Sequence, residues 1–126
     1  LIETVLNVNI ANPLLSIYIT NLSDKPTFID NTILHTSKRI NGDDKFTVPH
    51  PKGMFPRKLE SRESYKHEYS TTSIYSQVLK NLDPTETIKA IVTTTTGKSY
   101  KSNKFTVQHI VGHMEVATNL NAKETP

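Results

Sequence analysis

A predicted β-hairpin near the C-terminal end most constrains how this chain folds. A β-branched run over residues 90–95 and an extended run over residues 100–107 flank the turn Thr96-Gly97-Lys98. A glycine-containing turn between two such runs is typical of an antiparallel pair of strands. Because β-branched residues favour the pleated surface of a sheet, we expect the last two strands at residues 88–95 and 99–110.

Upstream of this hairpin, the sequence predicts further short strands joined by turns. Residues 15–21 alternate apolar and polar side chains at period two, the pattern of a strand with one buried face. Turns rich in proline, asparagine, aspartate and glycine separate the other extended runs, which cover residues 4–10, 27–35, 45–48 and 63–69. One helix of two to three turns is expected near residues 72–82, where Ile74, Val78 and Leu82 recur at a spacing of four.

These elements predict an all-β fold, an antiparallel β-sandwich of about seven strands with one short helix. A parallel sheet is excluded because its crossover connections would require several helices. The length of 126 residues suits one domain. We expect the sandwich over residues 1–111 and a polar, mobile C-terminal tail over residues 112–126. The expected core consists of apolar side chains from the strands: Val8, Leu15, Ile17, Ile19, Phe28, Ile33, Leu59, Ile91, Phe105 and Val107.

Composition excludes several classes of site. The chain has no cysteine, which excludes a disulfide framework, thiolate metal ligands and a cysteine nucleophile. The net charge is +3, but only Arg39, Arg57 and Arg62 among the basic residues are arginines, which nucleic-acid readers favour over lysine. No apolar run approaches the roughly 20 residues that span a bilayer. A lysine-decorated surface is the simplest interpretation of the charge.

The order of these elements resembles the small immunoglobulin-like β-sandwich domains of bacterial and phage proteins. The resemblance covers roughly residues 13–107 and rests on residues 15–21, on residues 56–65 and on the hairpin at residues 89–102. Related chains often carry Pro-Gly where this chain has Ser61-Arg62, and often an acidic residue near Thr95. The resemblance implies an accessory or interaction domain and supplies no catalytic residues.

No catalytic or metal-binding constellation is expected. His109, His113 and Glu115 have the spacing of metal ligands on a helix, but Gly112 interrupts the segment, and on a strand the two histidines would stand about 13 Å apart. No serine occupies a Gly-x-Ser-x-Gly turn, and the four glycines form no phosphate-binding loop. We therefore expect no enzymatic activity, no cofactor and no metal.

Two surfaces are candidates for binding. The loop at residues 50–56 contains Met54 and Phe55, large apolar side chains in irregular backbone, where binding residues concentrate. Its alternative is that Phe55 closes one end of the core. The second surface combines Lys101 and Lys104 with Tyr100, as single-strand nucleic-acid platforms do, although lysines also protect an edge strand from aggregation.

The sequence therefore predicts a non-catalytic interaction or accessory domain of bacterial or phage origin, with another protein as its partner. The alternative is a carbohydrate- or nucleic-acid-binding module that uses the tyrosine and lysine surface.

Overall fold

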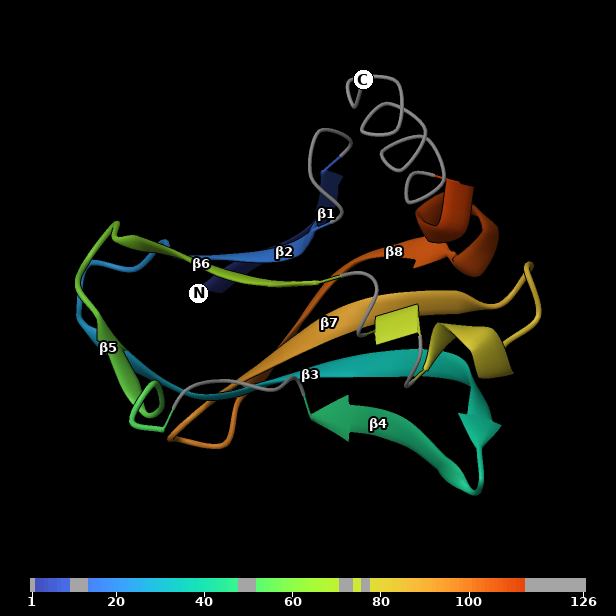
Figure 1. Ribbon diagram of the computed structural model, residues 1–126. Coiled ribbons are helices and arrows are strands. Elements are labelled where there is room, and N and C mark those ends of the chain that lie inside the picture. The colour runs from blue at the N-terminus through green and yellow to red at the C-terminus, as the bar shows by residue number, and fades with distance from the viewer. Residues whose placement is uncertain (1, 10–13, 48–51, 71–73, 76–77, 113–126) are drawn as a thin grey trace.

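The protein is an all-β sandwich of two antiparallel sheets, which lie one above the other in Figure 1. This computed structural model describes residues 2–9, 14–47, 52–70, 74–75 and 78–112. The three-stranded sheet has the order β1 (Ile2–Asn9), β2 (Leu14–Asn21), β6 (Ser64–Ser70). The five-stranded sheet has the order β4 (Asp43–Thr47), β3 (Thr27–Ile40), β7 (Thr87–Thr94), β8 (Ser99–Thr106), and β5 (Arg57–Leu59) pairs with the start of β3. The chain therefore crosses between the sheets three times, through the β2–β3 loop, the β5–β6 turn and the β6–β7 connection.

The seven predicted strands are all present, and the eighth, β5, was not predicted. It is only three residues long and follows the proline-rich segment that ends at Pro56. Among the described residues, no helix is long and apolar enough to cross a membrane.

The prediction of a strand through residue 110 is wrong, because β8 ends at Thr106 and residues 107–112 are helical. The Val107 N–H donates to the Glu86 carbonyl over 2.9 Å, and beyond this bond the chain no longer pairs with β7. The Thr106 hydroxyl then accepts the N–H of His109 over 3.3 Å, as an N-cap residue does. Val107 and Ile110 are buried one helical turn apart, so this segment adds to the core.

The predicted helix at residues 72–82 is only partly helical in the described residues. Residues 74–75 are helical, and the Val78 N–H donates to the Ile74 carbonyl over 2.8 Å. A 3-10 helix then covers Leu79–Asn81, and Leu82 is already extended. The predicted apolar stripe is nevertheless buried, since Ile74, Val78 and Leu82 all belong to the core cluster.

The buried residues confirm the core predicted for β2, whereas the core predicted for β3 is wrong. Leu15, Ile17, Ile19, Leu59 and Val107 are buried as predicted, and Phe105 packs partly buried against the core.

Phe28 is 44% exposed and Ile33 is only half-buried, so both predictions for β3 are wrong. β3 buries Ile29 and Leu34 instead. A bulge between Ile29 and Asn31 shifts the register there, which a strict alternation does not anticipate. Ile91 is buried, but outside the core cluster, and the side chain of Val8 lies outside the described residues.

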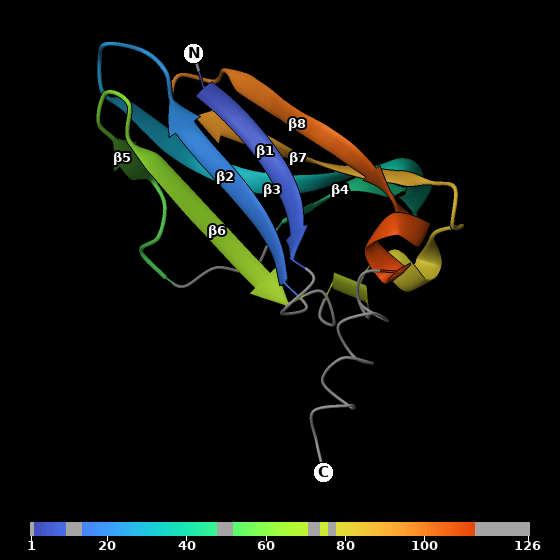
Figure 2. The same ribbon diagram turned by 90° about the horizontal axis from the view of Figure 1, so that it is seen from above.

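A pair of side-chain hydrogen bonds links the two sheets where β1 approaches β8 (Figure 2). The Leu6 N–H donates to Asn103 Oδ1 over 2.9 Å, and Asn103 Nδ2 donates to the Leu6 carbonyl over 3.0 Å. The Asn103 side-chain amide thus bonds both backbone groups of Leu6 on the edge strand β1, as a neighbouring strand would.

The turn between β5 and β6 holds Arg62 at a φ of +67°. This left-handed conformation favours glycine and costs other residues about 1–2 kcal/mol. We expect Arg62→Gly to raise the free energy of unfolding by about 0.5–1 kcal/mol, because the exposed Arg62–Asp24 ion pair that it removes contributes little. Urea denaturation followed by circular dichroism measures the change. Arg39→Gly within β3 is the matched control and should lower stability; equal losses in both variants would contradict this account of the turn.

Candidate functional site

A bulge in β8 brings Lys101 and Lys104 onto one face of the five-stranded sheet. Lys104 lies opposite Lys89, and Lys101 lies opposite Ile91, with a register shift between these two pairs. The two lysines are three positions apart, so a regular strand would point them to opposite faces. The extra residue of the bulge instead gives both lysines the outward direction of their partners on β7.

The predicted binding residue Tyr100 points to the opposite face of β8 from both lysines. It is adjacent in sequence to Lys101, and the bulge turns Lys104 away from its face. Tyr100 lies opposite the buried Val92, and Tyr100 and Phe105 pack against the core cluster. The expected combination of Tyr100 with Lys101 and Lys104 on one surface is therefore not formed.

The outer face of this sheet carries a row of basic side chains that crosses four strands, and we call it the lysine row. His35 of β3 lies opposite both Lys45 of β4 and Lys89 of β7, and Lys89 lies opposite Lys104 of β8. Neighbouring strands are spaced about 4.8 Å apart, so the lysine row spans roughly 14 Å. The sequence did not reveal this row, because its members are far apart in the chain and meet only through strand register.

The lysine row borders a shallow groove of about 350 Å³. The floor is aliphatic: Ile33 and Ile91 lie opposite each other on β3 and β7. Thr93, Ser99 and Lys101 line the groove beside them, together with His35, Lys45 and Lys89 of the row. We call this surface the lysine groove. Ile91 faces away from the core but is buried in the floor of this groove, which explains why an apolar residue occupies the position.

The four lysines of this surface are not neutralised by carboxylates. No ion pair among the described residues involves Lys45, Lys89, Lys101 or Lys104. In the described part of the chain, the ion pair at the row is that of Asp44, whose Oδ2 lies 3.2 Å from His35 Nε2.

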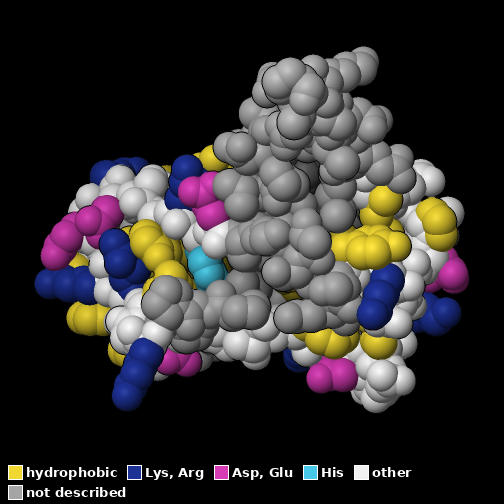
Figure 3. All heavy atoms as spheres, in the orientation of Figure 1, with side chains coloured by type: hydrophobic (Ala, Val, Ile, Leu, Met, Phe, Trp, Pro, Cys, Tyr) yellow, Lys and Arg dark blue, Asp and Glu magenta, His cyan; other side chains and the backbone are white. Residues whose placement is uncertain are grey.

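The surface near β5 and β6 has a different charge pattern, with basic and acidic side chains interspersed (Figure 3). There Lys58 pairs with Glu60, and Lys66 with Glu68, each over 3.1 Å. The hydrogen bond to the Glu68 carboxylate, with its negative charge, raises the pKa of Lys66. The lysine groove therefore differs from this surface in that its four lysines take part in none of the ion pairs of the described residues.

The other predicted binding residues, Met54 and Phe55, do not line the lysine groove. Both are half-buried. Phe55 packs against the core cluster and meets the ring of His67 edge-on, with ring centroids 6.0 Å apart. His67 is itself buried and hydrogen-bonds through Nδ1 to the Thr32 hydroxyl over 3.1 Å, across the two sheets. Phe55 therefore covers a buried polar contact in the core.

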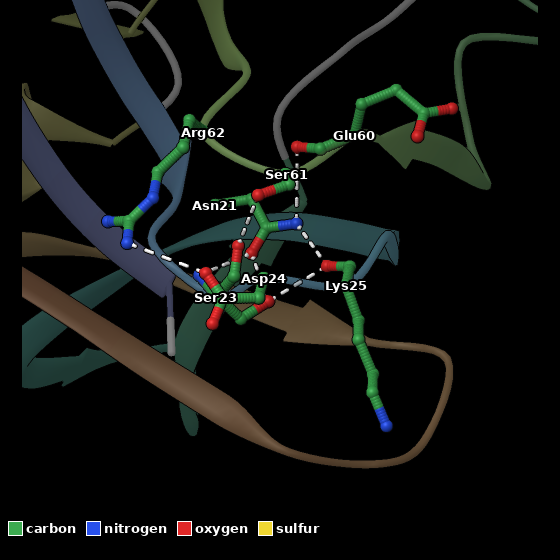
Figure 4. Close-up of polar contacts among 7 residues, drawn as sticks. All are labelled: Asn21, Ser23, Asp24, Lys25, Glu60, Ser61 and Arg62. Atoms are coloured by element: carbon green, nitrogen blue, oxygen red, sulfur yellow. Dashed lines mark hydrogen bonds and ion pairs between the residues drawn. The ribbon is translucent and has the colours of Figure 1, made fainter.

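A cluster of polar contacts surrounds Asn21 at the end of β2 (Figure 4). Asn21 Nδ2 lies 2.8 Å from the Lys25 carbonyl, 3.1 Å from that of Leu59 and 3.2 Å from that of Glu60. Asn21 Oδ1 accepts from the N–H and the hydroxyl of Ser23 over 3.0 and 2.7 Å. Both ends of the amide have hydrogen-bond partners within the protein. This cluster therefore has a structural role: it holds the β2–β3 loop against the β5–β6 turn.

No group of three or more possible metal ligands is present among the described residues. The strand-spacing argument for His109 and His113 does not apply, since residues 107–112 are helical. The ring of His109 stacks on Phe105 with centroids 4.8 Å apart. His113, Glu115 and the predicted tail beyond Gly112 lie outside the described residues.

Comparison with known proteins gives only distant structural similarity. No protein-family model matches this chain, and no curated protein matches it. A solved structure, the X-ray structure of Northeast Structural Genomics Consortium target SoR45, is similar over 83% of this chain and 81% of that chain, at 15% sequence identity and a TM-score of 0.35. This similarity assigns no family to the chain.

Proposed function

We propose that this protein is a non-catalytic interaction domain that binds a partner protein through the lysine groove. The observation that carries the proposal is the position of Lys89. Lysines on the edge strands β4 and β8 have a structural explanation, because charged side chains there prevent pairing with the edge of another molecule. Lys89 lies on β7, between β3 and β8. The backbone of β7 is already paired on both sides, so that explanation does not apply to Lys89.

The lysine row also lowers the stability of the folded protein. Like charges directly opposite each other on neighbouring strands are destabilising, and Lys89 faces Lys104 directly. Arrangements that cost stability are typical of functional sites. The aliphatic floor beside the row supplies the apolar contact area that a protein interface requires.

The second candidate, a nucleic-acid or carbohydrate module built on tyrosine and lysine, has less support. Binding of single strands depends on aromatic side chains that stack on bases beside the basic groups. Tyr100 and Phe105 pack on the core side of β8, away from the lysines.

The immunoglobulin-like resemblance belongs to the same proposal. It is supported by the two antiparallel sheets and by the turn after β5, where Arg62 adopts the left-handed conformation that the Pro-Gly of related chains would accommodate. An accessory domain of a bacterial or phage protein, as that resemblance implies, would act by binding rather than by catalysis.

A selection from a displayed random peptide library tests the proposal. Thr93→Trp should fill the groove, because Thr93 lines it beside Ile91. We expect peptides enriched on the wild-type domain to lose binding to this variant. The matched control is Thr20→Trp on the outer face of the three-stranded sheet, which should retain binding.

Two results would overturn the proposed function. The first is a library that yields no enriched peptide. The second is enriched peptides that bind Thr93→Trp as well as they bind the wild-type domain, since the groove would then not be the binding surface.

A further inference from the structure

We propose that the lysine groove selects an acidic, extended peptide segment in which a carboxylate and an aliphatic side chain are two residues apart. This inference rests on the proposed function and adds the chemistry of the partner. It follows from the charge of the groove, from the spacing between its floor and its lysines, and from the direction of its aromatic neighbours.

Lys89 is half-buried between Lys104 and His35 on the neighbouring strands. Neither Lys89 nor Lys104 has a carboxylate partner among the described residues, and Asp44 is engaged by His35. A carboxylate placed between the two lysines would relieve their mutual repulsion and form charge-assisted hydrogen bonds. Electrostatic complementarity of this kind selects an acidic partner and rejects a basic one.

The floor and the lysine row are one strand repeat apart. Ile33 and His35 are two residues apart on β3, as are Ile91 and Lys89 on β7. Side chains two residues apart on a strand are separated by roughly 6.7 Å. An extended peptide that runs along the strands repeats at the same distance on one face. An aliphatic side chain over the Ile33–Ile91 floor therefore places the side chain two residues away at the lysine row.

The floor argues for a peptide over other polyanions. Ile33 and Ile91 are aliphatic and offer apolar contact without an aromatic platform, whereas single-stranded nucleic acids use such platforms for stacking. Phosphate or sulfate groups would satisfy the lysines but would leave the floor without an apolar partner.

Two peptides of identical composition test the inference. In Ac-Thr-Glu-Thr-Ile-Thr-Glu-Thr-NH2 both glutamates lie two residues from the isoleucine and share its face. In Ac-Thr-Thr-Glu-Ile-Glu-Thr-Thr-NH2 they lie on the opposite face. In an NMR titration of the ¹⁵N-labelled domain, we expect the first peptide to bind at least about tenfold more tightly than the second, with shifts concentrated in β3, β7 and β8. Its affinity should fall as salt is raised.

Matched variants locate the charge. Lys89→Gln combined with Lys104→Gln should weaken binding of the first peptide at least about tenfold. Lys66→Gln on the other sheet removes the same kind of charge and should leave binding unchanged. Circular dichroism of each variant confirms that the fold is retained.

Each other outcome rejects the inference. Equal binding of the two peptides, or no binding of either, overturns the proposed spacing. Loss of binding in Lys66→Gln as large as in the groove variants overturns the site and indicates an effect of net charge. Tighter binding of a thymidine oligonucleotide or of heparin indicates a nucleic-acid or sulfated-glycan partner instead. If library peptides bind in the groove but carry no acidic residues, the proposed function stands and this inference fails.

Discussion

Replacing Asn21 by alanine is expected to lower the free energy of unfolding by about 3–5 kcal/mol. The Asn21 side chain is fully buried. Its amide donates toward carbonyls on both sides of the crossover and accepts twice from Ser23. Alanine would leave the buried Leu59 carbonyl without this donor, and each buried polar group left unpaired costs about 1–3 kcal/mol.

Urea denaturation followed by circular dichroism measures this loss. Asn7→Ala, on the exposed face of β1, is the matched control and should change stability by less than about 0.5 kcal/mol. Ser23→Ala removes only one partner of the amide and should cost about 1 kcal/mol. If Asn21→Ala cost no more than Ser23→Ala, the cluster would not lock the two sheets together.

Replacing Phe55 by alanine is expected to cost about 2–3 kcal/mol. Its ring is half-buried on the core cluster and against His67, so truncation loses apolar contact. It would also open the Thr32–His67 hydrogen bond to water. The alternative reading of Phe55 as a binding anchor predicts a change within about 1 kcal/mol.

Phe28→Ala is the same substitution at a side chain that is 44% exposed, and it should cost less than about 1 kcal/mol. A thermal melt of both variants therefore separates core packing from surface chemistry. A Phe55→Ala melting temperature equal to that of Phe28→Ala would favour the binding-loop interpretation.

The strands could be predicted wherever a single face is apolar. In β2, Leu15, Ile17 and Ile19 alternate with polar residues, and all three are buried. β3 contains the neighbouring apolar pairs Phe28-Ile29 and Ile33-Leu34, which fit either phase. Burial then depends on the bulge after Ile29 and on the aliphatic floor of the groove, and both are set by neighbouring strands.

The candidate site could be predicted only in part, for the same reason. Lys101 and Lys104 were predicted from the sequence to share a surface with Tyr100. They are three positions apart, which on a regular strand would point them to opposite faces, and it is the bulge in β8 that gives them the same face. Lys45, His35 and Lys89 join them through strand pairings, of which the longest joins His35 to Lys89, 54 positions apart. No local pattern in one sequence reports such contacts.

The bond between Asn103 and Leu6 has a kinetic consequence for β1. On an edge strand, alternate N–H groups point away from the sheet and exchange their hydrogens readily with water. The Leu6 amide is held by Asn103, so its hydrogen should exchange only when the two sheets separate locally at β8. The exchange rate of the Leu6 amide would thus report how often β1 and β8 separate from each other.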